Sequence, residues 1–183
     1  MEKLKIDFDE IQKAMEDISR EAFDYFLDIQ TGDLIILSED IIARAQTVLD
    51  ESIDEDMEDY DEVEFDEDQD IPDWMEEEIE LAVDIFLHEK DRYARIPERN
   101  SGSAYAAMKG FTEGLEDTLL QESLTAILDG KGAFRKFKAA LESHPKERKM
   151  WYGYNAKAAK LEIEAWLKSL GIECDKRPVT SDL

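Results

Sequence analysis

Three carboxylates and one imidazole recur at intervals of four residues in the middle of the chain. Residues four apart share a helix face, so these side chains would form one column that could hold a divalent metal ion. No second His or Cys stands at ligand spacing, and like charges four apart cost only about 0.2–0.5 kcal/mol each on a solvated face. The sequence therefore favours a solvated acidic face and leaves a metal site as the alternative. The residues concerned are Glu76, Glu80, Asp84 and His88.

A second group of residues has the opposite charge and could bind an anion. Lys131 and Gly132 lead into a predicted helix, with Arg135 one turn along, and the free backbone N–H groups at a helix N-terminus attract anions. In the alternative interpretation, Gly130 ends one helix and Gly132 gives the backbone of the turn its conformational freedom. The bases then pair with the acidic half of the same chain. The segment has no Walker pattern. The candidate anion site consists of Arg95, Lys131, Gly132, Arg135 and Lys138.

The most acidic segment, residues 51–71, raises the question of a calcium site. It contains no Gly, whereas an EF-hand loop needs one at its sixth position. Blocks of like charge repel one another and resist compaction, so we expect a mobile segment here. Ordered carboxylates at this density could instead imitate the phosphates of a nucleic acid and occupy the groove of a basic protein. The charge mimic stays open as the alternative to a solvated segment.

The negative charge belongs to the N-terminal half of the chain. Residues 1–100 contain 35 Asp and Glu against 9 Lys and Arg, whereas residues 101–183 contain 12 against 13. The formal net charge is −25. A field of this sign repels phosphate backbones and anionic lipids, so direct nucleic-acid binding and membrane binding are disfavoured. A basic protein is the partner that the charge favours, and the oligomeric state stays open.

Catalytic motifs are missing from the sequence. No Gly-x-Ser-x-Gly elbow, Rossmann fingerprint or kinase motif set is present. The sequence has only 2 His and no Glu-x-x-His motif, which argues against a di-iron bundle. We therefore predict no cofactor and no catalytic residue. Cys174 is the only cysteine, and no apolar run approaches the roughly 20 residues that span a bilayer. With no signal-peptide pattern at the start, we expect a cytoplasmic protein.

The hydrophobic spacing predicts an α+β protein that is mainly helical and has a small antiparallel sheet. We expect a single domain over residues 1–183. Helices are predicted over residues 7–19, 39–49 and 72–90, the second capped by Ser38, and four more follow residue 100. Alternating residues on both sides of Gly32 predict a hairpin, and residues 92–97 predict a third strand that ends at Pro97.

The four C-terminal helices should supply much of the core. Ser101 or Ser103 is expected to cap the first of them, and Gly171 followed by Ile172 predicts a Schellman stop after the last. We expect the aromatic and aliphatic side chains on their apolar faces to be buried. These are Phe134, Phe137, Ile163 and Trp166, and the stripe of the last helix runs through Tyr152, Ala156, Ala159, Ile163, Trp166 and Leu170.

Several short segments have an order and spacing that resemble those of a known protein family. They are Arg92 to Pro97, Gly130 to Lys138, Trp151-Tyr152, the closing Trp166 to Ile172, and the hairpin around Gly32. As a set they resemble uncharacterised protein family 0158, a bacterial group, over most of the chain except the acidic segment. The resemblance implies a small cytoplasmic bacterial protein. It implies no activity, cofactor or catalytic residue.

Two classes of function follow from the sequence. The first is a non-catalytic interaction or regulatory protein that meets a basic partner through residues 50–90. The second is a small enzyme or ligand-binding protein with an anion site near Gly130 to Arg135. A deep cleft where Arg95, Lys131 and Arg135 converge would favour the second class, and a convex surface with paired charges would favour the first.

Overall fold

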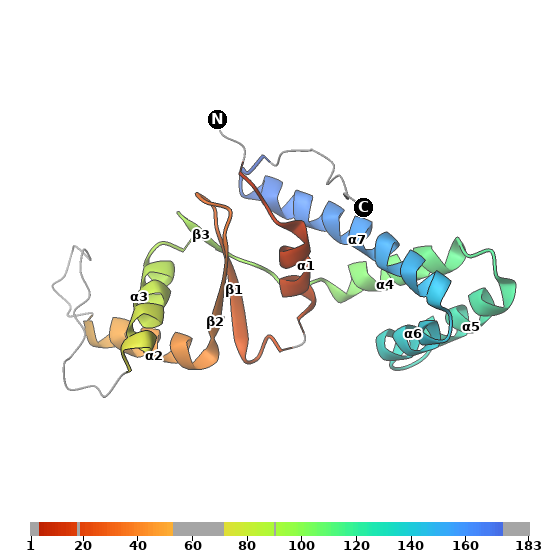
Figure 1. Cartoon of the computed structure of the whole chain (residues 1–183), viewed down its shortest axis with the longest axis horizontal. Coiled ribbons are helices and arrows are strands. Elements are labelled where there is room, and N and C mark those ends of the chain that lie inside the picture. The colour runs from red at the N-terminus through yellow and green to blue at the C-terminus, as the bar shows by residue number, and fades with distance from the viewer. Residues whose placement is uncertain (1–3, 18, 53–71, 90, 174–183) are drawn as a thin grey trace. The chain divides into compact units, whose positions relative to one another are not determined.

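The computed structural model describes residues 4–17, 19–52, 72–89 and 91–173. Within them the chain is mostly helical with one small antiparallel sheet, which confirms the predicted fold class (Figure 1). Two compact units are present. The sheet unit holds the described residues of the ranges 1–7 and 17–97, and the helical unit holds residues 8–16 and 98–173. The expectation of a single domain stays a prediction, and the acidic segment predicted to be mobile lies outside the described residues from residue 53 onward.

The sheet unit contains the predicted hairpin and third strand. The strands are β1 (Phe23–Asp28), β2 (Leu34–Ser38) and β3 (Tyr93–Arg95), in the spatial order β2-β1-β3 with antiparallel neighbours. Gly32 lies in the β1–β2 turn with φ +83°, and a Cβ there would come within 2.5 Å of the Lys5 carbonyl oxygen. Both the backbone conformation and the close approach therefore require glycine.

Two helices cover one face of this sheet. Helix α2 (Glu39–Ser52) begins directly after β2, where the Ser38 hydroxyl accepts a hydrogen bond from the Ile41 N–H at 3.3 Å, as predicted. Helix α3 (Asp73–Leu87) follows Pro72. Alternate strand residues and the inner faces of both helices form the core of the sheet unit, which consists of Phe26, Leu37, Ile41, Ala45, Val48, Met75, Ile79, Ala82, Val83, Ile85 and Tyr93.

The helical unit is built on one long helix. Its elements are α1 (Phe8–Glu16), α4 (Ser101–Glu113), α5 (Thr118–Leu128), α6 (Ala133–Glu142) and α7 (Pro145–Ser169). Helix α7 packs against α1, α4 and α6. At its N-terminal half, Trp151 lies edge-on to Phe137 with ring centroids 5.0 Å apart and to Phe111 at 5.4 Å. This aromatic cluster joins α4, α6 and α7 in one core.

The predicted inner faces of α6 and α7 are partly wrong. Phe137 and Ile163 are buried as expected, but Phe134 is 42% exposed and Trp166 is only half-buried. Helix α6 turns Ala133, Phe137 and Leu141 inward, and Phe134 lies about 100° around the helix from Ala133. In α7 the inward residues are Trp151, Ala159, Ile163 and Leu167, so Tyr152 and Leu170, which were expected inside, are exposed.

Of the helix caps predicted for α4 and α7, one is wrong and one is confirmed. Asn100 caps α4, because its side-chain oxygen accepts from the N–H groups of Gly102 at 2.8 Å and Ser103 at 3.3 Å, so the expected serine cap is wrong. The predicted stop after α7 is confirmed. Gly171 has φ +76°, and the two Schellman hydrogen bonds run from Gly171 N–H to the Lys168 carbonyl and from Ile172 N–H to the Leu167 carbonyl.

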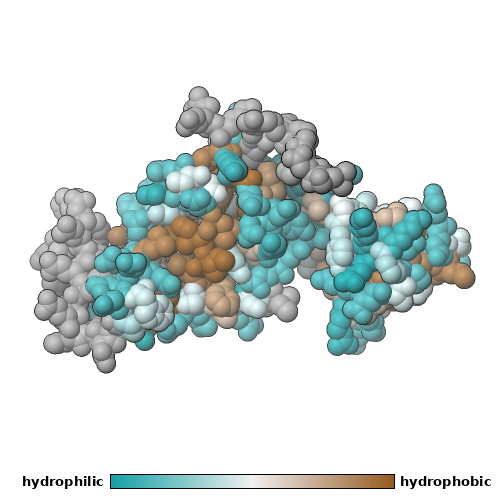
Figure 2. All heavy atoms as spheres, in the orientation of Figure 1, coloured by the Kyte–Doolittle hydropathy of each residue, from teal (hydrophilic) through white to brown (hydrophobic). Residues whose placement is uncertain are grey.

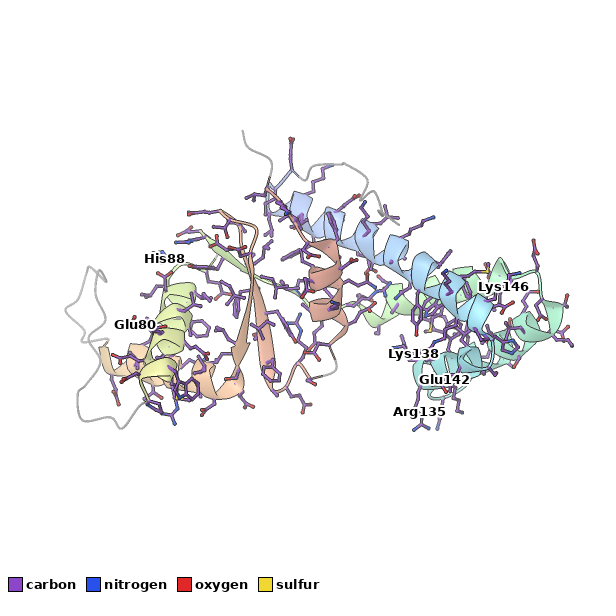
Figure 3. The ribbon with its side chains drawn as sticks, viewed as in Figure 1. Glu80, His88, Arg135, Lys138, Glu142 and Lys146 are labelled. Atoms are coloured by element: carbon purple, nitrogen blue, oxygen red, sulfur yellow. The ribbon has the colours of Figure 1, made fainter. Side chains whose placement is uncertain are left out.

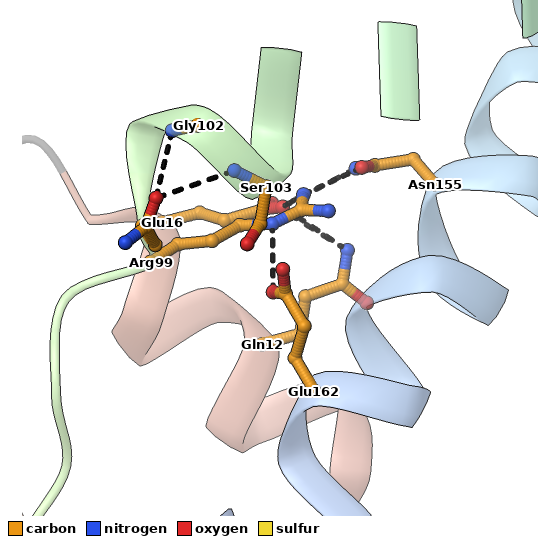
Figure 4. Close-up of polar contacts among 8 residues, drawn as sticks. Gln12, Glu16, Arg99, Gly102, Ser103, Asn155 and Glu162 are labelled. Atoms are coloured by element: carbon orange, nitrogen blue, oxygen red, sulfur yellow. Dashed lines mark hydrogen bonds and ion pairs between the residues drawn. The ribbon is translucent and has the colours of Figure 1, made fainter. Parts of the chain in front are cut away.

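One buried arginine organises the polar contacts of the helical unit (Figure 4). The side chain of Arg99 is 7% exposed, and its guanidinium contacts Glu16 of α1 together with Asn155 and Glu162 of α7. Its backbone N–H donates to the Met15 carbonyl at 2.9 Å. Arg99 therefore ties α1, the entry to α4, and α7 to one another.

Candidate functional site

The outer surface of α3 carries carboxylates and large apolar side chains together. Residues 74, 77, 78 and 81 are three and four apart, so they share one side of the helix. Trp74 is 63% exposed and Leu81 is 38% exposed. We call this surface the α3 acidic face; it consists of Asp73, Trp74, Glu77, Glu78, Glu80 and Leu81.

The core of the sheet unit sets the orientation of this face. Met75, Ile79, Ala82 and Val83 point inward and are buried, so the helix cannot rotate to bury Trp74 without exposing them. Figure 2 shows hydrophobic surface over the sheet unit between α3 and β1 in this view. The large apolar side chains that are exposed among the described residues of this unit are Phe23, Ile36, Trp74 and Leu81.

The carboxylates of the α3 acidic face lie in a stretch of the sequence that is poor in bases. Residues 39–89 contain 23 Asp and Glu but only one Lys or Arg. That one is Arg44, which lies 3.5 Å from Asp40 within α2. Among the described residues, none of the four carboxylates of the face forms an ion pair. The surface therefore presents uncompensated negative charge around two apolar side chains.

The column expected as a metal site lies on the same helix. His88 Nε2 is 3.5 Å from Asp84 Oδ1, and Glu80 and His88 are both exposed (Figure 3). The other Asp84 oxygen accepts from the Tyr93 hydroxyl at 2.8 Å. Burial and that hydrogen bond raise the pKa of Tyr93 to about 12. Within the described ranges no three His, Cys, Asp or Glu side chains are grouped so that they could hold a metal, and the Glu76 to His88 site stays a prediction.

An ion pair between a buried carboxylate and a partly exposed arginine in the sheet unit was not foreseen from the sequence. Asp28 is almost fully buried and accepts hydrogen bonds from Arg92 Nη2 at 3.0 Å and from the N–H groups of Gln30 and Thr31. Burial alone raises the pKa of the Asp28 carboxyl, but these hydrogen bonds outweigh it and hold the pKa below its ordinary value. The sequence feature that could have predicted this pair is an acidic residue at the end of a strand, just before the hairpin turn, where its side chain can accept hydrogen bonds from the turn.

The residues of the candidate anion site are divided between the two units. Arg95 belongs to β3 of the sheet unit, where its Nε lies 2.7 Å from Asp24 Oδ2. The other residues belong to the helical unit, where Gly132 has φ +67° immediately before α6. Arg135 and Lys138 project from α6, with Lys146 at the start of α7 (Figure 3). The structure thus groups four of the five predicted residues, Lys131, Gly132, Arg135 and Lys138, on one unit.

Those bases belong to a larger set of exposed bases on α6, the turn before it and the first turns of α7. We call it the α6–α7 basic face; it consists of Lys131, Arg135, Lys136, Lys138, Lys146, Arg148 and Lys149, all exposed. Arg148 donates to the Tyr152 hydroxyl at 2.9 Å, and Phe134 is exposed among the α6 bases. Within the helical unit, no described carboxylate forms an ion pair with any member of this face. Pairing of these bases with the acidic half of the chain stays a prediction, because most of that half belongs to the sheet unit.

A small hollow in the helical unit is lined by none of the predicted site residues. It has a volume of about 100 Å³ and is lined by Tyr105, Lys109, Thr112, Glu113, Thr125, Leu128 and Asp129. Small-molecule sites usually occupy roughly 300–1,000 Å³. This hollow is too small for most organic ligands.

These features define an α+β protein with one acidic helix face and one basic helix surface. A family model, Uncharacterised protein family (UPF0158), matches residues 63–177, and the chain belongs to this family. The resemblance noted in the sequence is thereby confirmed, although the hairpin lies outside the matched range. No curated protein and no solved structure matches the chain. Among the described helices, none has both the length and the apolar character needed to cross a membrane.

Proposed function

We propose that the protein is a non-catalytic interaction protein whose α3 acidic face binds a basic protein. One observation carries the proposal: Trp74 and Leu81 are exposed on a helix face whose carboxylates have no ion-pair partner among the described residues. Exposed apolar side chains rimmed by polar groups are typical of protein interaction sites.

The two kinds of side chain would have different roles in binding. Trp74 offers a large rigid surface, and buried aromatic side chains dominate the binding energy of many interfaces. Glu77, Glu78 and Glu80 would select a cationic partner and accelerate the encounter, since charge complementarity acts mainly on specificity and association rate. The partner should therefore combine Lys or Arg with an apolar pocket or side chain.

The proposal is tested by capture on the immobilised full chain from a native cell lysate, followed by binding measurements with the purified partner. The variant Glu77→Gln/Glu78→Gln/Glu80→Gln removes three charges while keeping side-chain size. We expect one identified basic protein to bind the wild-type chain and to be lost with this variant. Binding should also weaken as salt increases, because salt screens charge pairs on a surface.

A matched control removes the same number of charges from exposed positions elsewhere. Glu113→Gln/Glu116→Gln/Glu122→Gln lies in the helical unit. It should retain the partner. A partner that both variants retain, or that both lose, would contradict the assignment to the α3 acidic face.

A second candidate function is a small enzyme or ligand-binding protein with an anion site near Gly130 to Arg135. It is supported by the exposed bases of α6, which have no described carboxylate partner. Titration with inorganic phosphate, followed through the backbone NMR signals of residues 131–136, tests it. Saturable shifts that are lost in Arg135→Gln would support this function, and unchanged signals would reject it.

A further inference from the structure

We propose that a basic partner of the α3 acidic face is a second copy of this chain, which contributes its α6–α7 basic face. The inference rests on the proposed function, because it names the occupant of the same surface. It predicts a head-to-tail contact in which unlike faces of two copies meet.

The charge distribution of the chain supplies the first argument. The ranges 1–7 and 17–97 of the sheet unit contain 31 Asp and Glu against 7 Lys and Arg, whereas those of the helical unit contain 14 against 13. Two sheet units would repel each other, so a contact between two α3 acidic faces is disfavoured. Residues 131–149 contain 7 Lys and Arg against 2 Glu, and these bases are the complementary surface that the same chain offers.

The exposed apolar side chains supply the second argument. On α3, Trp74 and Leu81 stand seven residues apart, about 10 Å along the helix axis, with Glu77 and Glu78 between them. On α6, Phe134 is 42% exposed, next to Arg135 and one turn before Lys138. One face has carboxylates between two apolar side chains, and the other has an apolar side chain among cations. Packing Phe134 between Trp74 and Leu81 would therefore bring opposite charges together.

The availability of both faces supplies the third argument. Within its own unit, neither face forms an ion pair with a described residue, although the cations of α6 and the carboxylates of the α3 acidic face are exposed. A second copy offers a basic face to the acidic face and an acidic face to the basic face. The exposed Phe134, which the sequence pattern places in the core, then has a role at the surface.

Sedimentation of the full chain over a concentration series tests the proposal. We expect the average mass of the wild-type protein to rise above the 21.1 kDa of one chain as the concentration increases. Two charge-reversal variants are compared with it. Glu77→Lys/Glu78→Lys/Glu80→Lys reverses the α3 acidic face, and Lys131→Glu/Arg135→Glu/Lys138→Glu reverses the α6–α7 basic face. Each variant alone should lose the concentration dependence, because its two faces then have the same sign.

An equimolar mixture of the two variants provides the decisive measurement. Each variant offers the face that the other one needs, so association should return in the mixture. Misfolding cannot produce this rescue, and circular dichroism of each variant provides an independent check of its fold. Wild-type protein that stays at 21.1 kDa at all concentrations would overturn the proposal, as would variants that associate like the wild type.

Two further outcomes distinguish self-association from the binding of a different macromolecule. Monomeric wild-type protein that still captures a basic protein through Glu77, Glu78 and Glu80 would refute self-association and leave the proposed function standing. Binding of a labelled single-stranded oligonucleotide, lost in Lys131→Glu/Arg135→Glu/Lys138→Glu and unaccompanied by self-association, would assign the basic face to a nucleic acid and overturn the proposal.

Discussion

Arg99 and Glu16 form an ion pair across 83 positions of the chain. The guanidinium is almost fully buried, and it also contacts Asn155 and Glu162 of α7. A planar group with five donors can serve several acceptors at fixed angles, which a single ammonium cannot do. The polar contacts between α1 and α7 thus depend on arginine specifically.

Arg99→Lys should therefore lower the stability of the helical unit. The substitution keeps the charge but loses part of the simultaneous hydrogen bonds, and a hydrogen bond to a charged group contributes about 1.5–3 kcal/mol. Thermal denaturation of the full chain measures the loss. Arg44→Lys, at an exposed pair on α2, is the control and should cost less than about 0.5 kcal/mol. Equal melting temperatures for both variants would show that the Arg99 network contributes little.

Two phenylalanines of α6 give a matched test of the structure. Phe137 is fully buried between Phe111 and Trp151, so Phe137→Ala should cost on the order of 3 kcal/mol or more through lost burial and a cavity. Phe134 is exposed, and Phe134→Ala should cost less than about 1 kcal/mol. Chemical denaturation of both variants checks the difference. A larger loss for Phe134→Ala would mean that α6 turns its other side to the core.

Gly153 offers a stabilising substitution. It lies inside α7, is exposed, and has no heavy atom within 4 Å of the position that a Cβ would take. Gly153→Ala should raise the stability by about 0.5–1 kcal/mol, because alanine loses less backbone freedom on folding. Gly32→Ala is the opposite case, since φ +83° and the Lys5 carbonyl oxygen at 2.5 Å both oppose a side chain. Thermal denaturation of both variants measures the contrast, and a destabilised Gly153→Ala variant would contradict the open surroundings of this position.

The Asp28–Arg92 pair predicts a pH dependence with a definite sign. The folded-state pKa of Asp28 lies below its ordinary value of 3.8, so its contribution is present above that pH and is lost as the pH falls through the folded pKa. Asp28→Asn should cost about 1–3 kcal/mol at neutral pH through weakened charged hydrogen bonds. The difference in melting temperature between the wild type and this variant should shrink on acidification below pH 3.8. A difference that grows toward acid would contradict the assigned pair.

Salt should raise the thermal stability of the protein. The formal net charge of −25 is concentrated in the first 100 residues, and screening relieves repulsion that the folded state concentrates. Melting temperatures in a series from roughly 0.02 to 0.3 M NaCl at neutral pH measure the effect, since the Debye length falls to about 10 Å near 0.1 M. Stability that falls with salt would indicate that attractive pairs, and not repulsion, dominate the electrostatics.

Local sequence patterns were sufficient to predict most elements of the fold. Ser38 before a helical stripe, Gly32 between alternating strands, and Gly171 before Ile172 each act through nearby backbone groups, and the structure confirms all three. The predicted inner face of α7 was partly wrong, because the side that a helix turns inward depends on partners distant in the sequence. Trp151 is buried because it packs against Phe111 and Phe137, and the residue spacing within α7 does not reveal these two partners.

The candidate surfaces were predictable in composition but less so in geometry. The unequal charge of the two halves is visible in the sequence, and it points to the α3 carboxylates and the α6 bases. The exposure of Trp74 and Phe134 is not visible there, because an aromatic residue next to an apolar stripe usually extends the core. The Arg99 network joins residues from α1 and α7, and such long-range polar contacts follow only from the assembled unit.

The position of α1 has a consequence for protein fragments. Both neighbouring stretches of chain belong to the sheet unit, while α1 itself packs against α7 with Ile11 and Ala14 buried. The helical unit is therefore discontinuous in the polypeptide, and no single cut releases it whole. A fragment restricted to the matched range 63–177 would lack α1 and leave the α7 surface beneath it bare. A fragment that contains the complete helical unit must therefore include residues 8–16, near the N-terminus.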